Sequence, residues 1–283
     1  MKDITQEDLE NKAKLVSSYT GGFRIEGKEF VLGKGDFIVI AGPCRVESVE
    51  QMEKVVKTIK ENNLRFIRAG AYKHYTFPYS QRGLGEEGLK ILKEISDKYN
   101  LISVSEISAV SQIEFALKYV DVFQIGARHM QNLDLLTEIG KSKKPALLKR
   151  HHGSSLRDLI GAAEWLLYYG CKNLILCERG IVAPYTHDKD ANWLLDFQIV
   201  PAVKRICKLP IIMDVSHSSG NREFVSYLAP AVAASGADGL MIEIHPEPDK
   251  SQSDKNQIIG LEEFTKLMIK VRKVADALDK KVV

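Results

Sequence analysis

The sequence predicts an α/β fold, a single closed (β/α)8 TIM barrel preceded by a short N-terminal helix and a β-hairpin. Three observations lead to this prediction. Short β-rich runs alternate with amphipathic helical segments from residue 37 to the end of the chain. The alternation repeats eight times, which favours a closed barrel over the alternative of an open, doubly wound sheet. The 283 residues, 45% of them hydrophobic, suffice for one large core.

The predicted strands and helices follow one another in regular order. The strands are Phe37–Ala41, Arg65–Ala69, Leu101–Ser105, Val122–Ile125, Ala146–Lys149, Leu174–Cys177, Ile211–Asp214 and Gly239–Ile244. The helices, recognised by apolar residues spaced three and four apart, are Ser48–Asn62, Glu86–Tyr99, Ala109–Tyr119, Met130–Gly140, Ser155–Tyr169, Ala191–Cys207, Glu223–Ser235 and Leu261–Leu278. Ser48 is placed to cap the first helix, with Gln51 three residues further on.

The first 36 residues precede the barrel. Residues 1–20 are predicted to form an exposed helix. Residues 22–35 alternate apolar and polar side chains around a Gly-Lys turn, which predicts a hairpin that closes the N-terminal end of the barrel. We therefore expect an extension over residues 1–36 and a catalytic barrel over residues 37–283.

Composition argues against several classes of protein. The net charge is only +3, from 40 basic and 37 acidic residues, so nucleic-acid binding is not expected. No apolar run reaches the roughly 18 residues of a membrane span, and the polar, acidic N-terminus is unlike a signal peptide. The four cysteines form no Cys-x-x-Cys pair, which is typical of reduced thiols. A cytoplasmic location is the expectation.

Four residues of metal-binding types follow or end predicted strands: Cys44, His217, Glu243 and Asp254. The carboxyl ends of barrel strands meet at one end of the fold, so these side chains are expected to lie close together. Each alone has an ordinary explanation, such as a buried thiol, a helix cap, an ion-pair partner or a polar loop residue. Together, thiolate, imidazole and carboxylate suit a divalent Mn, Fe, Co or Zn ion better than Ca or Mg.

Cationic residues lie at the ends of the same strands. They are Arg68, Lys73, Arg128, Lys149, Arg150 and Arg179. Six cations facing one bowl repel one another unless an anion joins them. Arginine supplies planar paired donors for phosphate and carboxylate, whereas lysine acts as a compact charge. A metal ringed by these residues indicates an enzyme that acts on a small phosphorylated anion.

Seven or more blocks of sequence, in order, resemble the 3-deoxy-D-arabino-heptulosonate 7-phosphate (DAHP) synthases, in the short branch without an attached regulatory domain. The similarity runs from about Gly21 to Val274. The blocks are Ile-Ala-Gly-Pro-Cys44, Arg68-Ala-Gly-Ala, Gly83-Leu-Gly-Glu-Glu-Gly-Leu-Lys, Gln124-Ile-Gly-Ala-Arg128-His-Met-Gln-Asn, Leu147-Leu-Lys149-Arg150, Leu176-Cys-Glu-Arg179-Gly, Ser216-His217 and Gly236-Ala-Asp-Gly-Leu-Met-Ile-Glu243-Ile-His-Pro.

The resemblance implies a metal-dependent condensation of phosphoenolpyruvate with erythrose 4-phosphate, in the shikimate pathway and in a homo-oligomer, a dimer or tetramer. It implies Cys44, His217, Glu243 and Asp254 as metal ligands. The phosphoenolpyruvate site would comprise Arg68, Lys73, Arg128, Lys149 and Arg179 with the backbone N–H of Ala127. Catalytic roles would fall to Lys149, Lys73, His217 and Cys44. Crowded cations lower a lysine's pKa, so Lys149 is the candidate for proton exchange. Asp214 and Glu106 would support the ligands and the basic pocket.

The chain departs from the family pattern on the side that would bind the aldehyde. Tyr75 stands where the family has an arginine that grips the phosphate of erythrose 4-phosphate. His151-His152-Gly153 replaces Gly-Met-Ser, and the loop after strand six is also rewritten. The residues that we expect around the acceptor are Tyr75, Thr76, Arg45, His74 and Trp193.

Two interpretations of these departures stay open. Aromatic residues, including Phe77 and Tyr185, line a pocket for a larger or unphosphorylated aldose. Alternatively, Arg45, His74, His151 or Arg82 restores the phosphate grip from another position.

Two other functions fit the sequence less well. An octulosonate-phosphate synthase, which uses arabinose 5-phosphate, shares the Asp-Val-x-His motif, but that group usually lacks Gly-Ala-Arg and Leu-Leu-Lys-Arg, both of which are present here. A non-catalytic barrel that only binds phosphoenolpyruvate is disfavoured because every proposed metal ligand and anion-binding cation is retained.

Overall fold

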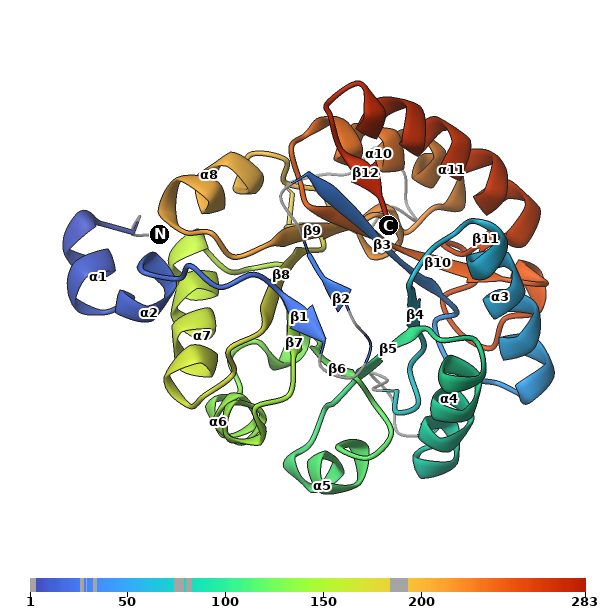
Figure 1. Cartoon of the computed structure of the whole chain (residues 1–283), viewed down its shortest axis with the longest axis horizontal. Coiled ribbons are helices and arrows are strands. Elements are labelled where there is room, and N and C mark those ends of the chain that lie inside the picture. Colours follow the sequence, from blue (N-terminus) through green and yellow to red (C-terminus); the bar gives the residue numbers. More distant parts are fainter. Residues whose placement is uncertain are drawn as a thin grey trace.

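The computed structural model describes residues 4–25, 28, 30–32, 35–73, 79, 83–183 and 193–283. Within them, eight parallel strands close into a barrel that is surrounded by helices (Figure 1), which confirms the predicted fold class. The strands are β3 (Asp36–Gly42), β4 (Phe66–Arg68), β5 (Ile102–Glu106), β6 (Val122–Ile125), β7 (Ala146–Lys149), β8 (Leu174–Glu178), β9 (Ile211–Asp214) and β10 (Gly239–His245). The barrel closes where β10 pairs with β3, from Gly239 beside Ile38 to Glu243 beside Gly42.

The helices follow the strands in the predicted order. They are α3 (Val49–Glu61), α4 (Glu86–Lys98), α5 (Ile113–Ala116), α6 (Leu133–Ser142), α7 (Leu156–Tyr168), α8 (Ile199–Ile206), α9 (Val215–Ser219), α10 (Arg222–Ala234) and α11 (Leu261–Asp276). Ser48 caps α3 as predicted, because its side chain accepts a hydrogen bond from the backbone N–H of Gln51. The short α9, directly after β9, was not predicted.

Most helices match the predicted bounds closely, and the larger differences are in α5, α6 and α8. The segment predicted as one helix over Ala109–Tyr119 consists of a 3-10 turn, η1 (Val110–Gln112), and the four-residue α5. A second turn, η2 (Ala127–His129), precedes α6, whose start is fixed by the side chain of Asn132. Helix α8 begins only at Ile199, because Leu194 is held in an extended bridge with Ile181.

Strand alternation divides the buried apolar residues into two clusters. In β3, Phe37, Val39 and Ala41 face the helices, while Ile38 and Ile40 face the barrel interior. The interior cluster also receives one or two residues from each of the other seven strands. This is the packed interior that is typical of the fold, so the chemistry is left to the strand ends.

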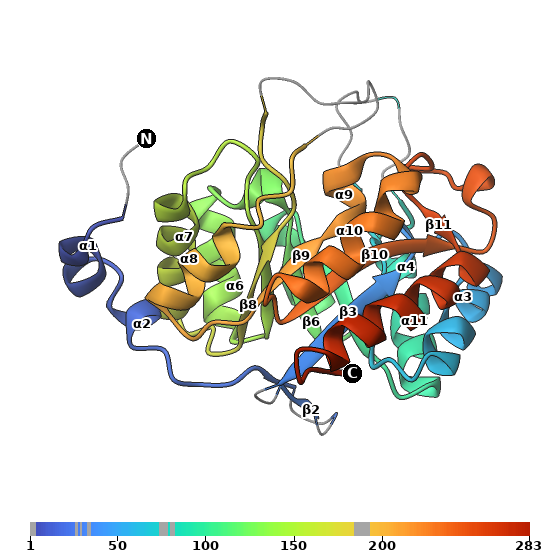
Figure 2. The same cartoon turned by 90° about the horizontal axis from the view of Figure 1, so that it is seen from above.

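The N-terminal hairpin closes one end of the barrel, as predicted. Strands β1 (Arg24–Ile25) and β2 (Phe30–Val31) pair antiparallel. The Phe30 ring meets the Phe66 ring edge to face, with centroids 4.9 Å apart. Figure 2 shows the hairpin and the C-terminus at one end of the barrel and α9 at the other.

The prediction of one exposed helix over residues 1–20 was wrong. Two short helices form instead, α1 (Gln6–Asn11) and α2 (Lys14–Ser17); α2 packs beside α7, and α1 packs against α2. The Glu164 carboxylate accepts the backbone N–H groups of Leu15 and Val16 at 3.0 and 2.8 Å. A carboxylate at a helix N-terminus is stabilising, and this one fastens α2 to the barrel.

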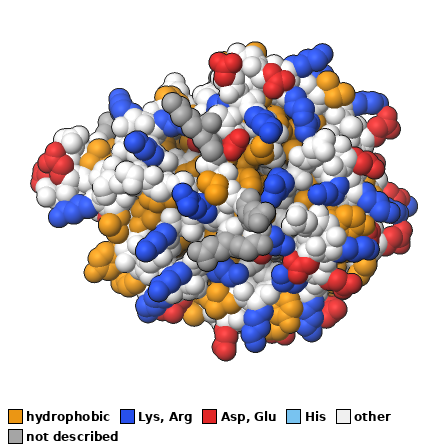
Figure 3. All heavy atoms as spheres, in the orientation of Figure 1, with side chains coloured by type: hydrophobic (Ala, Val, Ile, Leu, Met, Phe, Trp, Pro, Cys, Tyr) orange, Lys and Arg blue, Asp and Glu red, His pale blue; other side chains and the backbone are white. Residues whose placement is uncertain are grey.

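Three smaller elements complete the fold: η3 (Pro248–Lys250), β11 (Ile259–Gly260), which pairs in parallel with the end of β10, and β12 (Lys281–Val282), which pairs with the start of β3. Among the helices that the structure describes, none is long and apolar enough to cross a bilayer. On the hairpin face, Lys and Arg side chains are interspersed with acidic and apolar ones (Figure 3).

Candidate active site

Three of the four predicted metal ligands meet at the carboxyl end of the barrel. Cys44 lies just beyond β3, Glu243 lies within β10, and Asp254 lies in the segment between η3 and β11. Their ligand atoms are all within 4.8 Å of one another. The Cys44 thiol donates a hydrogen bond to Asp254 Oδ2 at 2.7 Å. Asp254 reaches this position from a left-handed backbone conformation, with φ of 50°.

His217, the fourth predicted ligand, stands beside this cluster on α9. Its Nε2 atom is 3.6 Å from Glu243 Oε1, and its Nδ1 atom is 2.9 Å from Asp214 Oδ2. Asp214 also caps α9 by accepting the backbone N–H of His217. The carboxylate thus orients the imidazole with Nε2 toward the cluster, an arrangement common for metal-binding histidines.

Lys73 joins the cluster from the loop after β4. Its ammonium donates to Cys44 Sγ at 2.7 Å and to Asp254 Oδ2 at 3.3 Å. Burial, reinforced by Glu243, raises the pKa of Cys44 to about 12 despite this neighbour. Burial would also raise the pKa of Asp254, but the charge of Lys73, followed by that of His217, lowers it to about 2. In this arrangement the thiol keeps its proton and the carboxylate is ionised.

Arg68 lies beneath the cluster and is only 2% exposed. Its Nη1 atom is 2.6 Å from Glu243 Oε1, and its Nε atom donates to Gln124, which in turn donates to Glu106. Burial would raise the pKa of Glu106, but Lys73 and Arg68 outweigh it and hold that pKa below its ordinary value. Glu106 therefore lies among these cations as a carboxylate.

Lys149 has a carboxylate partner, Asp214, in addition to the neighbouring cations. Its ammonium lies 2.5 Å from Asp214 Oδ2, and both side chains are buried. Burial alone would raise the pKa of Asp214, but His217 and Lys149 hold it well below its ordinary value. One buried carboxylate therefore contacts both a lysine and a histidine of the predicted site.

Four of the six predicted anion-binding cations are paired with carboxylates of the protein itself. Arg68, Lys73 and Lys149 each have the carboxylate partner described above. Arg150 binds Glu178 and Asp196 at 2.9 and 2.7 Å and donates to the Ser154 carbonyl. It belongs to a buried network behind the strands, because consecutive strand residues point to opposite sides.

The remaining predicted anion-binding residues lie at the ends of β6 and β8. Ala127 is buried in η2, and Arg128 beside it is exposed. Arg179, just after β8, is half-buried and has its guanidinium carbon 5.4 Å from the centre of the Trp193 ring. Burial lowers the pKa of Arg179.

The acceptor residues are only partly described. Arg45 is 4% exposed, and its backbone forms a parallel bridge with Gly70. Trp193 lies beside Arg179 and His152. Predictions for Tyr75, Thr76 and His74, and those for Phe77, Arg82 and Tyr185, lie outside the described residues.

Two residues that support the cluster were missed from the sequence. Gln257 donates to Glu243 Oε2 at 2.7 Å, and the Ser216 hydroxyl accepts the backbone N–H of Glu243 at 2.9 Å. Ser216 could have been noticed beside His217, whereas nothing in the polar segment around Gln257 distinguishes it.

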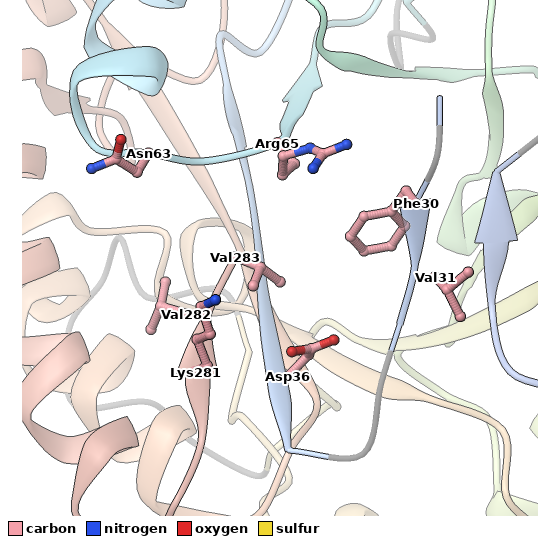
Figure 4. A pocket seen from close by; sticks show the side chains of 8 residues that line it. All are labelled: Phe30, Val31, Asp36, Asn63, Arg65, Lys281, Val282 and Val283. Carbon is pink, nitrogen blue, oxygen red and sulfur yellow. The ribbon is translucent and has the colours of Figure 1, made fainter. Parts of the chain in front are cut away.

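Two surface hollows lie at the opposite end of the barrel. A pocket of about 370 Å³ opens between the hairpin, Arg65 and the C-terminal residues (Figure 4). A second, of about 630 Å³, is lined by Arg24, Asp121 and Lys144, among others. Neither pocket is lined by a predicted site residue, so the volume of a pocket does not identify the active site in this protein.

Comparisons with known proteins agree with the geometry. The family model described as the DAHP synthetase I family matches residues 11–280. A phospho-2-dehydro-3-deoxyheptonate aldolase of Thermotoga maritima is 41% identical over 251 residues, which cover 89% of this chain and 73% of that one. A 2-dehydro-3-deoxyphosphooctonate aldolase of Desulfotalea psychrophila is 31% identical over 272 residues, covering 89% and 95%.

Solved structures give the same result. The crystal structure of the Thermotoga maritima DAHP synthase superposes with a TM-score of 0.85 at 39% identity, over 93% of this chain and 76% of that one. A truncated form of 3-deoxy-D-arabino-heptulosonate 7-phosphate synthase from Thermotoga maritima gives 0.86 at 37% identity, over 95% and 99%.

Proposed function

This chain belongs to the DAHP synthetase I family and is an enzyme of that transferase class, and we propose that it joins phosphoenolpyruvate to an aldose in a metal-dependent condensation. C3 of phosphoenolpyruvate bonds to the aldehyde carbon, water adds at C2, and inorganic phosphate leaves. The product is a 3-deoxy-2-ketoaldonate. The observation that carries the proposal is the convergence of Cys44, Glu243 and Asp254 next to Lys73 and Arg68, at the barrel end where such chemistry is found.

The donor set fits a divalent metal. A thiol and two carboxylates converge within 4.8 Å, and the His217 Nε2 atom borders them. We propose these four residues as the ligands of a Mn, Fe, Co or Zn ion, which as a Lewis acid would polarise an oxygen of a bound substrate. A bound cation also favours the thiolate form of Cys44, against the effect of burial.

The cations around the cluster are proposed to bind phosphoenolpyruvate. Lys73, Arg128, Lys149 and Arg179, with Arg68 below them and the backbone N–H of Ala127, supply the donors that a phosphate and a carboxylate require. Lys149 and Asp214 form the pair best placed to hold and release a proton, since their charged atoms are 2.5 Å apart in a buried position.

Erythrose 4-phosphate is the acceptor that the family relationship favours. A second candidate, a different aldose, is supported by Tyr75 at the position of the family's phosphate-gripping arginine. The similarity to 2-dehydro-3-deoxyphosphooctonate aldolases adds arabinose 5-phosphate to the acceptors worth testing.

The deciding experiment incubates metal-loaded protein with phosphoenolpyruvate and a panel of aldoses, and follows phosphate release and product mass. The panel contains erythrose 4-phosphate, arabinose 5-phosphate, ribose 5-phosphate and their unphosphorylated forms. Rapid turnover of erythrose 4-phosphate supports the first acceptor, and turnover of another aldose alone supports the second. Binding of phosphoenolpyruvate without turnover of any aldose would contradict the proposed reaction.

A further inference from the structure

A column of stacked rings stands beside the proposed phosphoenolpyruvate site. The His151 and His152 ring centroids are 4.1 Å apart, and the His152 and Trp193 centroids are 4.2 Å apart at an angle of 26°. The Arg179 guanidinium carbon lies 5.4 Å from the Trp193 centroid. The column therefore runs from the loop after β7, through Trp193, to the cation at the end of β8.

Backbone contacts hold the column in place. The His152 carbonyl accepts the N–H of Val182 at 2.9 Å, and Ile181 and Leu194 exchange two backbone hydrogen bonds. Trp193 N donates to the Ser218 carbonyl at 3.3 Å, which connects it to α9. These bonds hold the His152 and Trp193 backbones against the loop after β8 and against α9.

Gly180 lets Trp193 approach the chain next to Arg179. Its φ is +96°, and a Cβ at this position would lie 2.5 Å from the Trp193 Cβ. Any other residue would meet both a strained backbone and a steric clash. The turn that follows Arg179 is therefore shaped to receive the indole.

Arg179 has few other partners. Within the described part of the chain, its guanidinium takes part in no hydrogen bond or ion pair, in contrast to Arg68 and Arg150. A half-buried guanidinium with unused donors is ready to bind an anion. The indole face attracts the cation without occupying its N–H groups, so it fixes the side chain and leaves the donors available.

His152 completes the support on the other face of the indole. Burial lowers the pKa of this histidine, and the neighbouring His151, Arg179 and Arg128 lower it further. The ring is therefore neutral at neutral pH and stacks on Trp193 without adding a charge that would repel Arg179.

We propose that Trp193, backed by His152, is a positioning residue that holds the Arg179 guanidinium in place for an anionic group of phosphoenolpyruvate. The inference rests on the proposed function and deepens it. It assigns Trp193 to the phosphoenolpyruvate side, and it gives a role to His152, a residue that departs from the family pattern.

The test is a double-mutant cycle on the metal-loaded enzyme. Trp193→Leu removes the aromatic face, and we expect the Kd and KM for phosphoenolpyruvate to rise roughly 3- to 30-fold, with a smaller change in kcat. Trp193→Phe keeps a weaker face and should give an intermediate value. In the Arg179→Ala background, Trp193→Leu should have almost no further effect, because it acts through that arginine.

Two further measurements separate positioning from general damage to the fold. Trp165→Phe changes the other tryptophan, on α7, and should leave phosphoenolpyruvate binding unchanged; it also makes Trp193 the single tryptophan, whose emission can be excited selectively beside the tyrosines. In that variant, phosphoenolpyruvate should change the Trp193 emission. His152→Gln should raise the Kd in the same direction as Trp193→Phe.

The outcomes distinguish this inference from the proposed function. Failure of the unaltered enzyme to bind phosphoenolpyruvate would overturn the proposed function. The positioning role alone would be overturned if the unaltered enzyme and Trp193→Leu bound phosphoenolpyruvate with equal affinity. It would also be overturned if Trp193→Leu lowered the affinity equally in the presence and in the absence of Arg179.

Discussion

Lys149 and Asp214 come from two strands, β7 and β9, that are separated by β8, and their Nζ and Oδ2 atoms are 2.5 Å apart. The same carboxylate oxygen is 2.9 Å from His217 Nδ1. Asp214 therefore connects the residue proposed to move a proton with a residue proposed to bind the metal.

Asp214→Asn should reduce kcat about 10- to 100-fold, because the neutral amide no longer balances Lys149 or orients His217. Metal content, measured on the purified variant, should fall as well. Asp238→Asn, which alters the partner of Lys204 near the opposite end of β10, serves as the control. Unchanged kcat and metal content in Asp214→Asn would show that the carboxylate has no such role.

Cys44→Ala should abolish metal-dependent turnover, with a loss of at least about 100-fold, while the protein stays folded. The physical reason is the loss of the thiolate ligand from a small, convergent donor set. Elemental analysis and circular dichroism are the measurements. Cys207→Ala, a buried cysteine that follows α8, should keep full metal content. Full activity of Cys44→Ala would refute the ligand assignment.

Arg68→Met should lower the free energy of unfolding by about 3–5 kcal/mol, because Glu243 is left buried without its counter-charge. Both side chains are at most 2% exposed. Lys266→Met breaks an exposed ion pair on α11 and should cost no more than about 0.5 kcal/mol. Denaturant unfolding of both variants tests the contrast, and equal stabilities would contradict it.

Tyr75→Arg should lower the KM for erythrose 4-phosphate roughly 10-fold if the acceptor loop has changed its substrate, since an arginine supplies a charge-assisted grip on phosphate. Steady-state kinetics with erythrose 4-phosphate and with an unphosphorylated aldose provide the measurement. Tyr79→Arg adds the same charge at a side chain that is 93% exposed, and should have little effect. Equal improvement in both variants would mean that only the net charge of the loop matters.

Acidification should release α1 from the barrel. Asp8 bonds Lys12 and Thr5 and also pairs with both terminal nitrogens of Arg157, at 3.1 and 2.8 Å. These contacts, the Lys12 and Thr5 bonds first, hold the Asp8 pKa well below its ordinary value. A depressed folded pKa means that the stabilisation is complete above the unfolded value of about 3.9 and is lost as the pH falls below it.

Protection against hydrogen exchange of residues 5–12, measured relative to the intrinsic exchange rate at each pH, should fall progressively from about pH 4 down to pH 2. Asp8→Asn should show lower protection already at pH 5 and little further loss of protection on acidification. Identical exchange in the two proteins at pH 5 would contradict the role of Asp8.

The sequence was most informative about the strands. Three of them, including Ala146–Lys149, have the predicted bounds, because β-branched and aliphatic runs bounded by polar residues correspond directly to buried strands. Helix lengths were less predictable. The start of α8 depends on a bridge between Ile181 and Leu194. The prediction used only the spacing of apolar residues within the helical segment, and Ile181 lies outside that segment.

The proximity of Cys44 and Glu243 followed from topology, since strand ends must meet, whereas Asp254 comes from the segment between η3 and β11. The pairing of cations with carboxylates did not follow from topology, because it depends on the direction in which each side chain points. Arg150 turns away from Lys149 toward Glu178 and Asp196, and Asp214 reaches across β8. Strand alternation would have separated Lys149 from Arg150, but no pattern along the chain pairs either of them with its partner.

The hairpin described above places the hydrophobic closure of the barrel at the end opposite the reactive groups. Phe23 and Phe30 seal that end together with strand residues such as Phe66, none of which contributes to the cluster around Cys44. Mutations in the loops at the open end can therefore accumulate under selection for a new acceptor without weakening the seal. Proteins with this architecture can therefore change their substrate while the packing that supports folding is retained.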